Sequence, residues 1–192
     1  MLDIRTLQQF ISMNDLKKEG YTYYQINKIL EEGALVKLNK KYYENLLFNG
    51  EPNDFYASTA YSEKGVICLL SAAIHYGLSS ERPSHVDVAL PRRTRIPKSP
   101  EWPIMKYYLF SEPRYELGMK TINEQGNVYK IYDIEKTVCD IIFYRNKIGF
   151  EPAIEVIKNY MNCKERNLNK LMDYAGQLRE GSVIKQFVEV LA

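Results

Sequence analysis

The sequence predicts an α+β chain with two domains: a small N-terminal domain over residues 1–48, and a larger α+β domain over residues 54–192 that has a small, mostly antiparallel sheet and C-terminal helices. Helical and hairpin patterns share the first 48 residues, alternating strand patterns gather between residues 85 and 132, and helical periodicity dominates from residue 133 onward. The turn-forming stretch NGEPND, residues 49–54, separates the two domains.

Three short helices are expected in the first domain. Its first segment carries apolar residues at spacings of three and four, Ile4, Leu7 and Ile11, which predict an amphipathic helix. Ser12 begins a second helix-start pattern. Thr22 begins a third, in which the side chains of Thr22 and Gln25 can cap each other's free backbone donors. Gly33 follows where this last helix should end.

A short β-hairpin is expected next, because apolar residues in the stretch 35–38 lead into a turn at 39–41 and two tyrosines lead out of it. Three short helices followed by a hairpin are the layout of a winged helix-turn-helix. Its core would come from six apolar residues: Phe10, Leu16, Ile26, Ile29, Leu30 and Leu35.

The larger domain mixes strands and helices. The apolar run 65–78 predicts a helix buried at its centre. Strands are expected over four stretches: 85–90, 104–110, 115–122 and 127–132. A basic segment with four prolines follows the first of them and forbids regular structure there. From residue 133 onward the periodicity predicts amphipathic helices, and Pro152 suits the first turn of one of them.

Bulk composition excludes several classes of protein. The net charge of +2 gives no chain-wide basic excess, so any nucleic-acid contact must come from local clustering. Three widely spaced cysteines, Cys68, Cys139 and Cys163, suit free thiols in a reducing cytoplasm. The first ten residues do not resemble a signal peptide, and no apolar run is long enough to span a membrane. We therefore expect a cytoplasmic protein without a membrane partner.

Catalytic patterns are missing from the sequence. It has no phosphate-binding loop, no dinucleotide-binding glycine motif, no nucleophile elbow and no closely spaced pair of cysteines or histidines. The two histidines, His75 and His85, lie outside any such pattern. Asp87 stands on an expected strand, as in a nucleotidyltransferase, but Ala89 occupies the position of the second carboxylate that metal binding requires. We expect no enzyme activity, no bound metal and no cofactor.

The expected helix from Thr22 to Glu32 has a face that suits DNA contact. Its apolar residues share one side, at 100° per residue. The other side of its first two turns carries the candidate DNA-binding residues Tyr24, Gln25, Asn27 and Lys28, whose groups can read base edges or hold phosphates. Three lysines of the hairpin, Lys37, Lys40 and Lys41, are candidates for phosphate contact. The alternative is an ordinary solvated helix face.

A second basic patch lies in the proline-rich segment. Its members are Arg92, Arg93, Arg95 and Lys98, with no acidic residue among them. Such a cluster could extend a nucleic-acid surface or bind an acidic partner protein. The alternative is a solvated loop whose arginines pair with nearby carboxylates.

Four segments in this order resemble the AbiEi family of antitoxins. They are ISMNDLKKEGYTYYQINKILEEGALVKLNKKYYE, GVICLLSAAIHYGL, HVDVALPRRTR and YDIEKTVCDIIFYR, and the resemblance covers roughly residues 8–175. Members of this family are antitoxins of type IV toxin–antitoxin (abortive infection) systems. They pair with a nucleotidyltransferase-like toxin encoded alongside and repress their own operon by binding repeats in its promoter.

The resemblance implies that the N-terminal domain is a winged-helix repressor domain and that the domain beginning near Asp54 neutralises the toxin, with the Arg92–Arg95 patch as one candidate contact. The expected partners are therefore double-stranded promoter DNA and the toxin. Basic and acidic residues nearly balance in residues 1–46, and binding as a pair or cooperatively on repeated sites would compensate for this modest charge. We expect a monomer or weak dimer. The other reading is a protein–protein module anchored by four tyrosines: Tyr23, Tyr24, Tyr42 and Tyr43.

Overall fold

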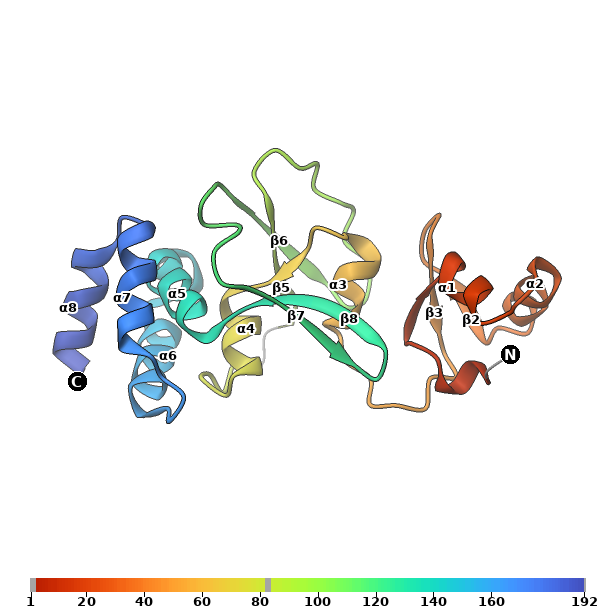
Figure 1. Cartoon of the computed structure of the whole chain (residues 1–192), viewed down its shortest axis with the longest axis horizontal. Coiled ribbons are helices and arrows are strands. Elements are labelled where there is room, and N and C mark those ends of the chain that lie inside the picture. Colours follow the sequence, from red (N-terminus) through yellow and green to blue (C-terminus); the bar gives the residue numbers. More distant parts are fainter. Residues whose placement is uncertain (1–2, 82–83, 192) are drawn as a thin grey trace. The chain divides into compact units, whose positions relative to one another are not determined.

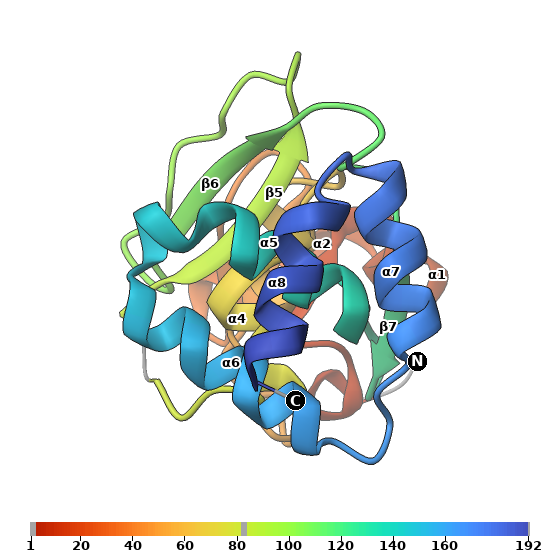
Figure 2. The ribbon, with the colours of Figure 1, turned by 90° about the vertical axis from the view of Figure 1, so that its left-hand side faces the viewer.

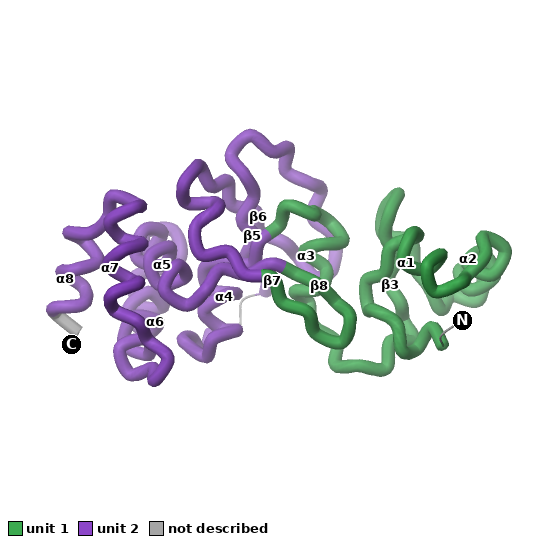
Figure 3. Tube along the Cα trace, in the orientation of Figure 1, with its two compact units in different colours: residues 1–65, 121–129 green, residues 66–120, 130–192 purple. Residues whose placement is uncertain are grey.

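The computed structural model describes residues 3–81 and 84–191, and it is a mixed α/β structure (Figure 1). Its described residues form eight α-helices, one 3₁₀ helix, a three-stranded sheet and a five-stranded sheet. The chain divides into two compact units (Figure 3). Unit 1 comprises residues 1–65 and 121–129, and unit 2 comprises residues 66–120 and 130–192. The division into folding domains at residues 48 and 54 stays a prediction.

Unit 1 contains short helices and a small antiparallel sheet. Its elements are the 3₁₀ helix η1 (Ile4–Thr6), β1 (Phe10–Ser12), α1 (Met13–Lys18), α2 (Tyr23–Glu31), β2 (Leu35–Lys37), β3 (Tyr42–Asn45) and α3 (Tyr56–Tyr61). Strand β3 lies between β1 and β2 and pairs antiparallel with both. The hairpin predicted from the sequence is therefore confirmed, and it acquires a third strand from the segment before α1.

Helices α1 and α2 begin where their caps predicted. The hydroxyl of Ser12 accepts a hydrogen bond from the backbone N–H of Asp15 at 3.1 Å. Thr22 and Gln25 form the reciprocal capping box at the start of α2. At the other end of α2, Gly33 adopts a left-handed φ of 72°, and the N–H groups of Gly33 and Ala34 close back onto the helix. This Schellman arrangement explains why a glycine follows the helix.

The first predicted helix is wrong. Instead of a helix over residues 2–11, the chain forms the short η1 and then the strand β1, in which Ile11 pairs with Tyr43. The carbonyl of Ile4 accepts from the side chain of Asn45 at 2.6 Å, and that of Gln9 accepts from the Asn45 N–H at 2.8 Å. In a helix over residues 2–11 the Ile4 carbonyl would accept from the Gln8 N–H, whereas here it accepts from a residue far along the sequence.

The core of unit 1 nevertheless uses the predicted apolar stripe. Its buried members are Ile4, Leu7, Ile11, Leu16, Tyr21, Ile26, Leu35 and Tyr43. Ile29 and Leu30 pack against this cluster while partly exposed, and Phe10 is half-buried. Because Ile26 is buried, the opposite face of α2 is exposed to solvent. This exposed face is part of the candidate site described below.

The five-stranded sheet runs in the order β6-β5-β4-β8-β7. Its strands are β4 (Val66–Ile67), β5 (Val86–Pro91), β6 (Met105–Phe110), β7 (Met119–Glu124) and β8 (Asn127–Tyr132). The expectation of a mostly antiparallel sheet is wrong, because β5 pairs parallel with β6 and β4 pairs parallel with β8, whereas β4 and β5 are antiparallel. Residues 92–104 are long enough to carry the chain back to the start of β6, as a parallel pair requires.

Two local features of the sheet region differ from or refine the predictions. The apolar run 65–78 is divided between β4 and the helix α4 (Leu69–His75), with Leu69 in a left-handed conformation at the junction. The β7–β8 turn appears where expected, and Gln125 and Gly126 both have positive φ, as a two-residue hairpin turn requires. The tip of this hairpin, residues 121–129, is assigned to unit 1.

Four helices complete unit 2: α5 (Ile134–Ile148), α6 (Phe150–Asn162), α7 (Leu168–Gln177) and α8 (Gly181–Leu191). These confirm the predicted C-terminal helices. Their apolar faces share one core with the sheet, to which Ala89 and Tyr108 contribute from the strands and Val138 and Val156 from the helices. Figure 2 looks onto these helices, with strands β5 and β6 behind them. Among the described residues, no helix is long and apolar enough to cross a membrane.

Candidate nucleic-acid interface

The outward face of α2 carries most of the residues singled out from the sequence. Tyr24 is 78% exposed, and Asn27 and Lys28 are exposed beside it, whereas Ile26 on the opposite face is completely buried. The ammonium of Lys28 lies 3.9 Å from the Glu32 carboxylate, with both side chains largely in water. Such an exposed pair is worth little, so Lys28 can exchange this partner for another anion. An aromatic ring, an amide and a cation therefore share one exposed face.

Gln25 is partly committed to holding the helix. Its Oε1 accepts from the Thr22 N–H at 2.9 Å and from the Thr22 hydroxyl at 3.0 Å. Only its amide NH₂ group is left for an external acceptor. Tyr23, also 60% exposed, has its hydroxyl bonded to the ammonium of Lys17, which lies 3.8 Å from the centre of its ring. Lys17, in the last turn of α1, was not predicted as a site residue. The available signal in the sequence was a lysine shortly before the start of α2.

The three hairpin lysines are not equivalent. Lys37 on β2 and Lys40 in the β2–β3 turn are exposed, and neither forms an ion pair with any described residue. Lys41 is exposed as well, but its ammonium lies 2.8 Å from the Glu63 carboxylate. The turn itself is shaped by Asn39, whose side-chain Oδ1 accepts from the Lys41 N–H at 2.8 Å. Two of the three lysines are thus free for phosphate oxygens.

The second basic patch lies in unit 2, on the loop that joins β5 to β6. Arg92, Arg93, Arg95 and Lys98 are all exposed. The interpretation that these arginines pair with nearby carboxylates finds no support in residues 3–81 and 84–191, since none of the four cations forms an ion pair there. The patch is a solvated group of cations with no described anionic partner.

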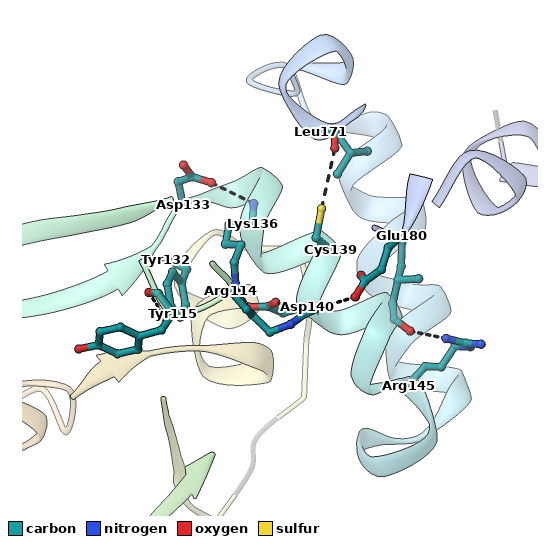
Figure 4. Close-up of polar contacts among 11 residues, drawn as sticks. Arg114, Tyr115, Tyr132, Asp133, Lys136, Cys139, Asp140, Arg145, Leu171 and Glu180 are labelled. Atoms are coloured by element: carbon teal, nitrogen blue, oxygen red, sulfur yellow. Dashed lines mark hydrogen bonds and ion pairs between the residues drawn. The ribbon is translucent and has the colours of Figure 1, made fainter. Parts of the chain in front are cut away.

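The sequence did not predict a buried charged cluster in unit 2 (Figure 4). Lys136 and Asp140 face each other one turn apart on α5, both completely buried, and their side chains form an ion pair. The guanidinium of Arg114 bonds both Asp140 and Glu180, and it stacks 3.9 Å from the Phe143 ring centre. Burial raises the pKa of Glu180, against the lowering effect of Arg114.

This cluster connects three segments of unit 2: the chain after β6, helix α5, and the junction between α7 and α8. Its two anions and two cations balance, which is how a protein interior tolerates charge. The i, i+4 spacing of Lys136 and Asp140 within the expected helix was the one available signal, because residues four apart share a helix face. Arg114 and Glu180 come from segments too distant in sequence for any local pattern to indicate.

Asp87, the carboxylate considered for catalysis, is 1% exposed on β5. Burial raises its pKa, and His85 opposes that rise from 3.2 Å away. Its backbone N–H donates to the hydroxyl of Ser71 at 2.8 Å. Within the described part of the chain, no three His, Cys, Asp or Glu residues are grouped so as to hold a metal ion. The arrangement therefore supplies no assembled set of carboxylates around Asp87.

Comparisons with known proteins give a fold relative and no family. No protein-family model matches the chain. No curated protein matches it either. Among solved structures, the crystal structure of the RV2827C protein from Mycobacterium tuberculosis is similar with a TM-score of 0.54 and 15% sequence identity, over 96% of this chain and 76% of that chain. At this identity the similarity concerns the fold alone, and it supports a mixed α/β architecture throughout the chain.

Proposed function

We propose that the chain is a DNA-binding transcriptional autorepressor and the antitoxin of a type IV toxin–antitoxin system of the AbiEi kind. In this proposal α1, α2 and the β2–β3 hairpin act as a winged helix-turn-helix, with α2 in the major groove and the hairpin on the phosphate backbone. Unit 2 counteracts a nucleotidyltransferase-like toxin. The role assigns no catalytic step to the chain and implies a cytoplasmic location.

The observation that carries the proposal is the pairing of two exposed features in unit 1. The first two turns of α2 present Tyr24, Asn27 and Lys28 to solvent, and the hairpin that follows presents Lys37 and Lys40 without anionic partners among the described residues. The exposed side chains of α2 can read base edges, and the hairpin lysines can neutralise phosphates without regard to base sequence.

A gel-shift titration tests the DNA-binding half. The full chain is titrated against its own upstream DNA and a scrambled duplex at two salt concentrations. We expect selective binding to the upstream DNA that weakens as salt rises, because each neutralised phosphate releases counterions. Equal affinity for both duplexes would contradict sequence-selective repression.

Three variants separate the roles within the interface. Lys40→Ala should weaken binding to both duplexes alike and reduce the salt slope by about 1, whereas Tyr24→Ala should lower the preference for upstream DNA. Lys158→Ala is the matched control, because Lys158 is exposed on α6 in unit 2 and forms no ion pair with a described residue. A reduction of binding in the control equal to that of Lys40→Ala would show a general charge effect.

Co-expression tests the antitoxin half. The nucleotidyltransferase-like toxin that this proposal expects to be encoded beside the chain is expressed alone and together with it, and growth is recorded. We expect growth to stop with the first and to recover with both. Failure of the chain to restore growth would remove the antitoxin role while leaving the DNA-binding role intact.

Tyr23 and Tyr24, 60% and 78% exposed, favour a second candidate function, in which unit 1 binds a partner protein. Exposed tyrosines are good interface anchors. The two other tyrosines considered for this role are less suitable, because Tyr43 is buried in the core and Tyr42 is half-buried. Charge reversal at Lys40 and Lys41 distinguishes the functions: retained DNA binding would favour the protein partner.

A further inference from the structure

The loop between β5 and β6, residues 92–104, combines free cations with an exposed indole. Its cations are the four of the second basic patch, and its one acidic residue is Glu101. Trp102, the single tryptophan of the chain, is 69% exposed. Burying a tryptophan side chain gives a large free-energy gain, so an indole left in water is a surface available to a binding partner.

Hydrogen bonds fix the loop at both of its ends. Arg92 and Arg93 occupy the two central positions of a turn that the Thr94 N–H closes onto the Pro91 carbonyl at 2.8 Å. The Arg92 N–H donates to the carbonyl of Phe110 at the end of β6, also at 2.8 Å. The arginines are therefore held beside the carboxyl end of β6 rather than on a free strand of chain.

At the other end, the Ser99 hydroxyl accepts from the Met105 N–H at 2.9 Å, which holds the loop against the start of β6. Pro97 restricts the backbone between the two anchors, and Pro100 and Pro103 restrict it between Ser99 and Met105. Figure 2 shows the loop leaving the end of β5, projecting beyond the sheet and returning to the start of β6. Because the loop is already partly ordered, it would lose less conformational entropy on binding a partner than an unrestrained loop would.

We propose that the loop 92–104 binds single-stranded nucleic acid, with the cations on its phosphates and Trp102 stacked on an unpaired base. Charge complementarity favours a polyanion, because the thirteen residues of the loop contain four exposed cations without described partners and only one carboxylate. The indole favours a single strand, since every unpaired base offers a flat π-face and the bases of a duplex are already stacked. An acidic protein would also satisfy the guanidiniums and bury the indole, so the test below includes poly-glutamate as the competing ligand.

This binding differs from the promoter binding proposed above. The loop belongs to unit 2, whereas α2 and the hairpin belong to unit 1. The inference therefore does not rest on the proposed repressor function. The double variant Lys37→Ala with Lys40→Ala should weaken duplex binding by unit 1 and leave single-strand binding by the loop unchanged. Measuring both kinds of binding in this variant therefore distinguishes a failure of one proposal from a failure of the other.

Trp102 is itself the reporter for the test, because tryptophan fluorescence of this chain comes from one residue. The full chain is titrated with short single-stranded RNA and DNA oligonucleotides of mixed sequence, with the annealed DNA duplex, and with poly-glutamate. We expect both single strands to quench Trp102 and the quenching to reverse with salt. The duplex and poly-glutamate should quench it far less.

Variants establish which residues cause the effect. Arg92→Ala, Arg93→Ala and Arg95→Ala together should lower affinity at least tenfold and reduce the salt slope, by about 0.7 for each phosphate of the single strand that is no longer neutralised. The control removes the same charge elsewhere in unit 2 with Lys120→Ala, Lys158→Ala and Lys164→Ala, all exposed. It should leave affinity within about twofold of the wild type. Circular dichroism verifies that both triple variants are folded.

Labelled oligonucleotides extend the test to the indole. Measured by fluorescence anisotropy, Trp102→Ala should weaken single-strand binding by about 5- to 100-fold, the usual worth of one stacked base, and Trp102→Tyr should restore most of it. No quenching by either single strand would overturn the proposal. So would equal reductions of affinity in the two triple variants. Stronger binding of poly-glutamate than of oligonucleotides would also overturn it and assign the loop to an acidic protein.

Discussion

Replacing Asp140 with asparagine removes one negative charge from a cluster in which it contacts two cations. Lys136 is completely buried and has Asp140 as its ion-pair partner among the described residues, whereas Arg114 keeps Glu180. The variant keeps the shape of the side chain, so the change isolates the charge. Lys136 would then have to remain charged without its counter-ion or lose its proton inside the protein, and both cost free energy.

The expected loss of stability follows from this burial. Removing one partner of a buried ion pair costs about 3–5 kcal/mol, because an uncompensated charge is left behind. A domain is stable by only roughly 5–15 kcal/mol, so the variant should lose a large fraction of its stability. With an m-value of about 2 kcal/mol/M, the urea midpoint of unit 2 should fall by roughly 2 M.

Urea unfolding followed by amide hydrogen exchange on α5 is the suitable assay, because it reports on unit 2 separately from unit 1. Asp173→Asn on the exposed side of α7 is the control and should stay within about 0.5 kcal/mol of the wild type. The double variant Lys136→Met with Asp140→Leu should recover at least half of the stability, since it removes both charges of the pair.

Two results would refute this reasoning. A destabilisation below about 1 kcal/mol in Asp140→Asn would show that Lys136 reaches water or another anion, contrary to its burial. A double variant as unstable as the single one would show that the cluster acts through its specific shape and hydrogen bonds, with the unpaired charge contributing little.

Three further predictions concern other parts of the chain. Thr22→Ala should lower the free energy of unfolding of unit 1 by about 1 kcal/mol in thermal melts, because the capping box of α2 is removed. Lys41→Ala should reduce the salt slope of DNA binding less than Lys40→Ala in gel shifts, since Lys41 is already paired. Hydrogen bonds from Ser80 lower the pKa of Glu155. The ionised carboxylate therefore stabilises the fold above its unfolded pKa, and this stabilisation is lost as pH falls through its folded pKa. The difference in Tm between the wild type and Glu155→Gln should be present at pH 7 and vanish in acid.

Local chemistry explains why some elements could be predicted. The starts of α1 and α2 depend on side chains within three residues of each other, such as Ser12 with the Asp15 N–H. The exposed face of α2 follows from its period alone, once Ile26 is buried. Signals of this kind are complete within a short window of sequence.

Non-local pairing explains the errors. The stripe Ile4, Leu7 and Ile11 has helical spacing and is buried as expected, yet β1 forms because β3 offers it a partner over thirty residues away. The parallel pairing of β5 with β6 likewise depends on the path of the intervening loop, which residue patterns do not determine. The charged cluster combines both cases: the Lys136–Asp140 spacing is local, and the contribution of Arg114 is not.

The interactions of the β2–β3 turn bear on how much of the chain a DNA-binding domain needs. The Asn39 side chain donates to the carbonyl of Ala60 at 2.8 Å, and Lys41 pairs with Glu63 at 2.8 Å. Both partners lie beyond residue 48, where the sequence predicts that the first domain ends. A fragment of residues 1–48 would lack this hydrogen bond and this ion pair, together with the side-chain oxygen of Asn127 that accepts from the Gln9 N–H at 2.8 Å. If DNA binding depends on the position of Lys40 in this turn, fragment 1–48 should bind upstream DNA more weakly than the full chain does. Equal affinity would show that the hairpin keeps its shape alone and that the predicted boundary is sufficient.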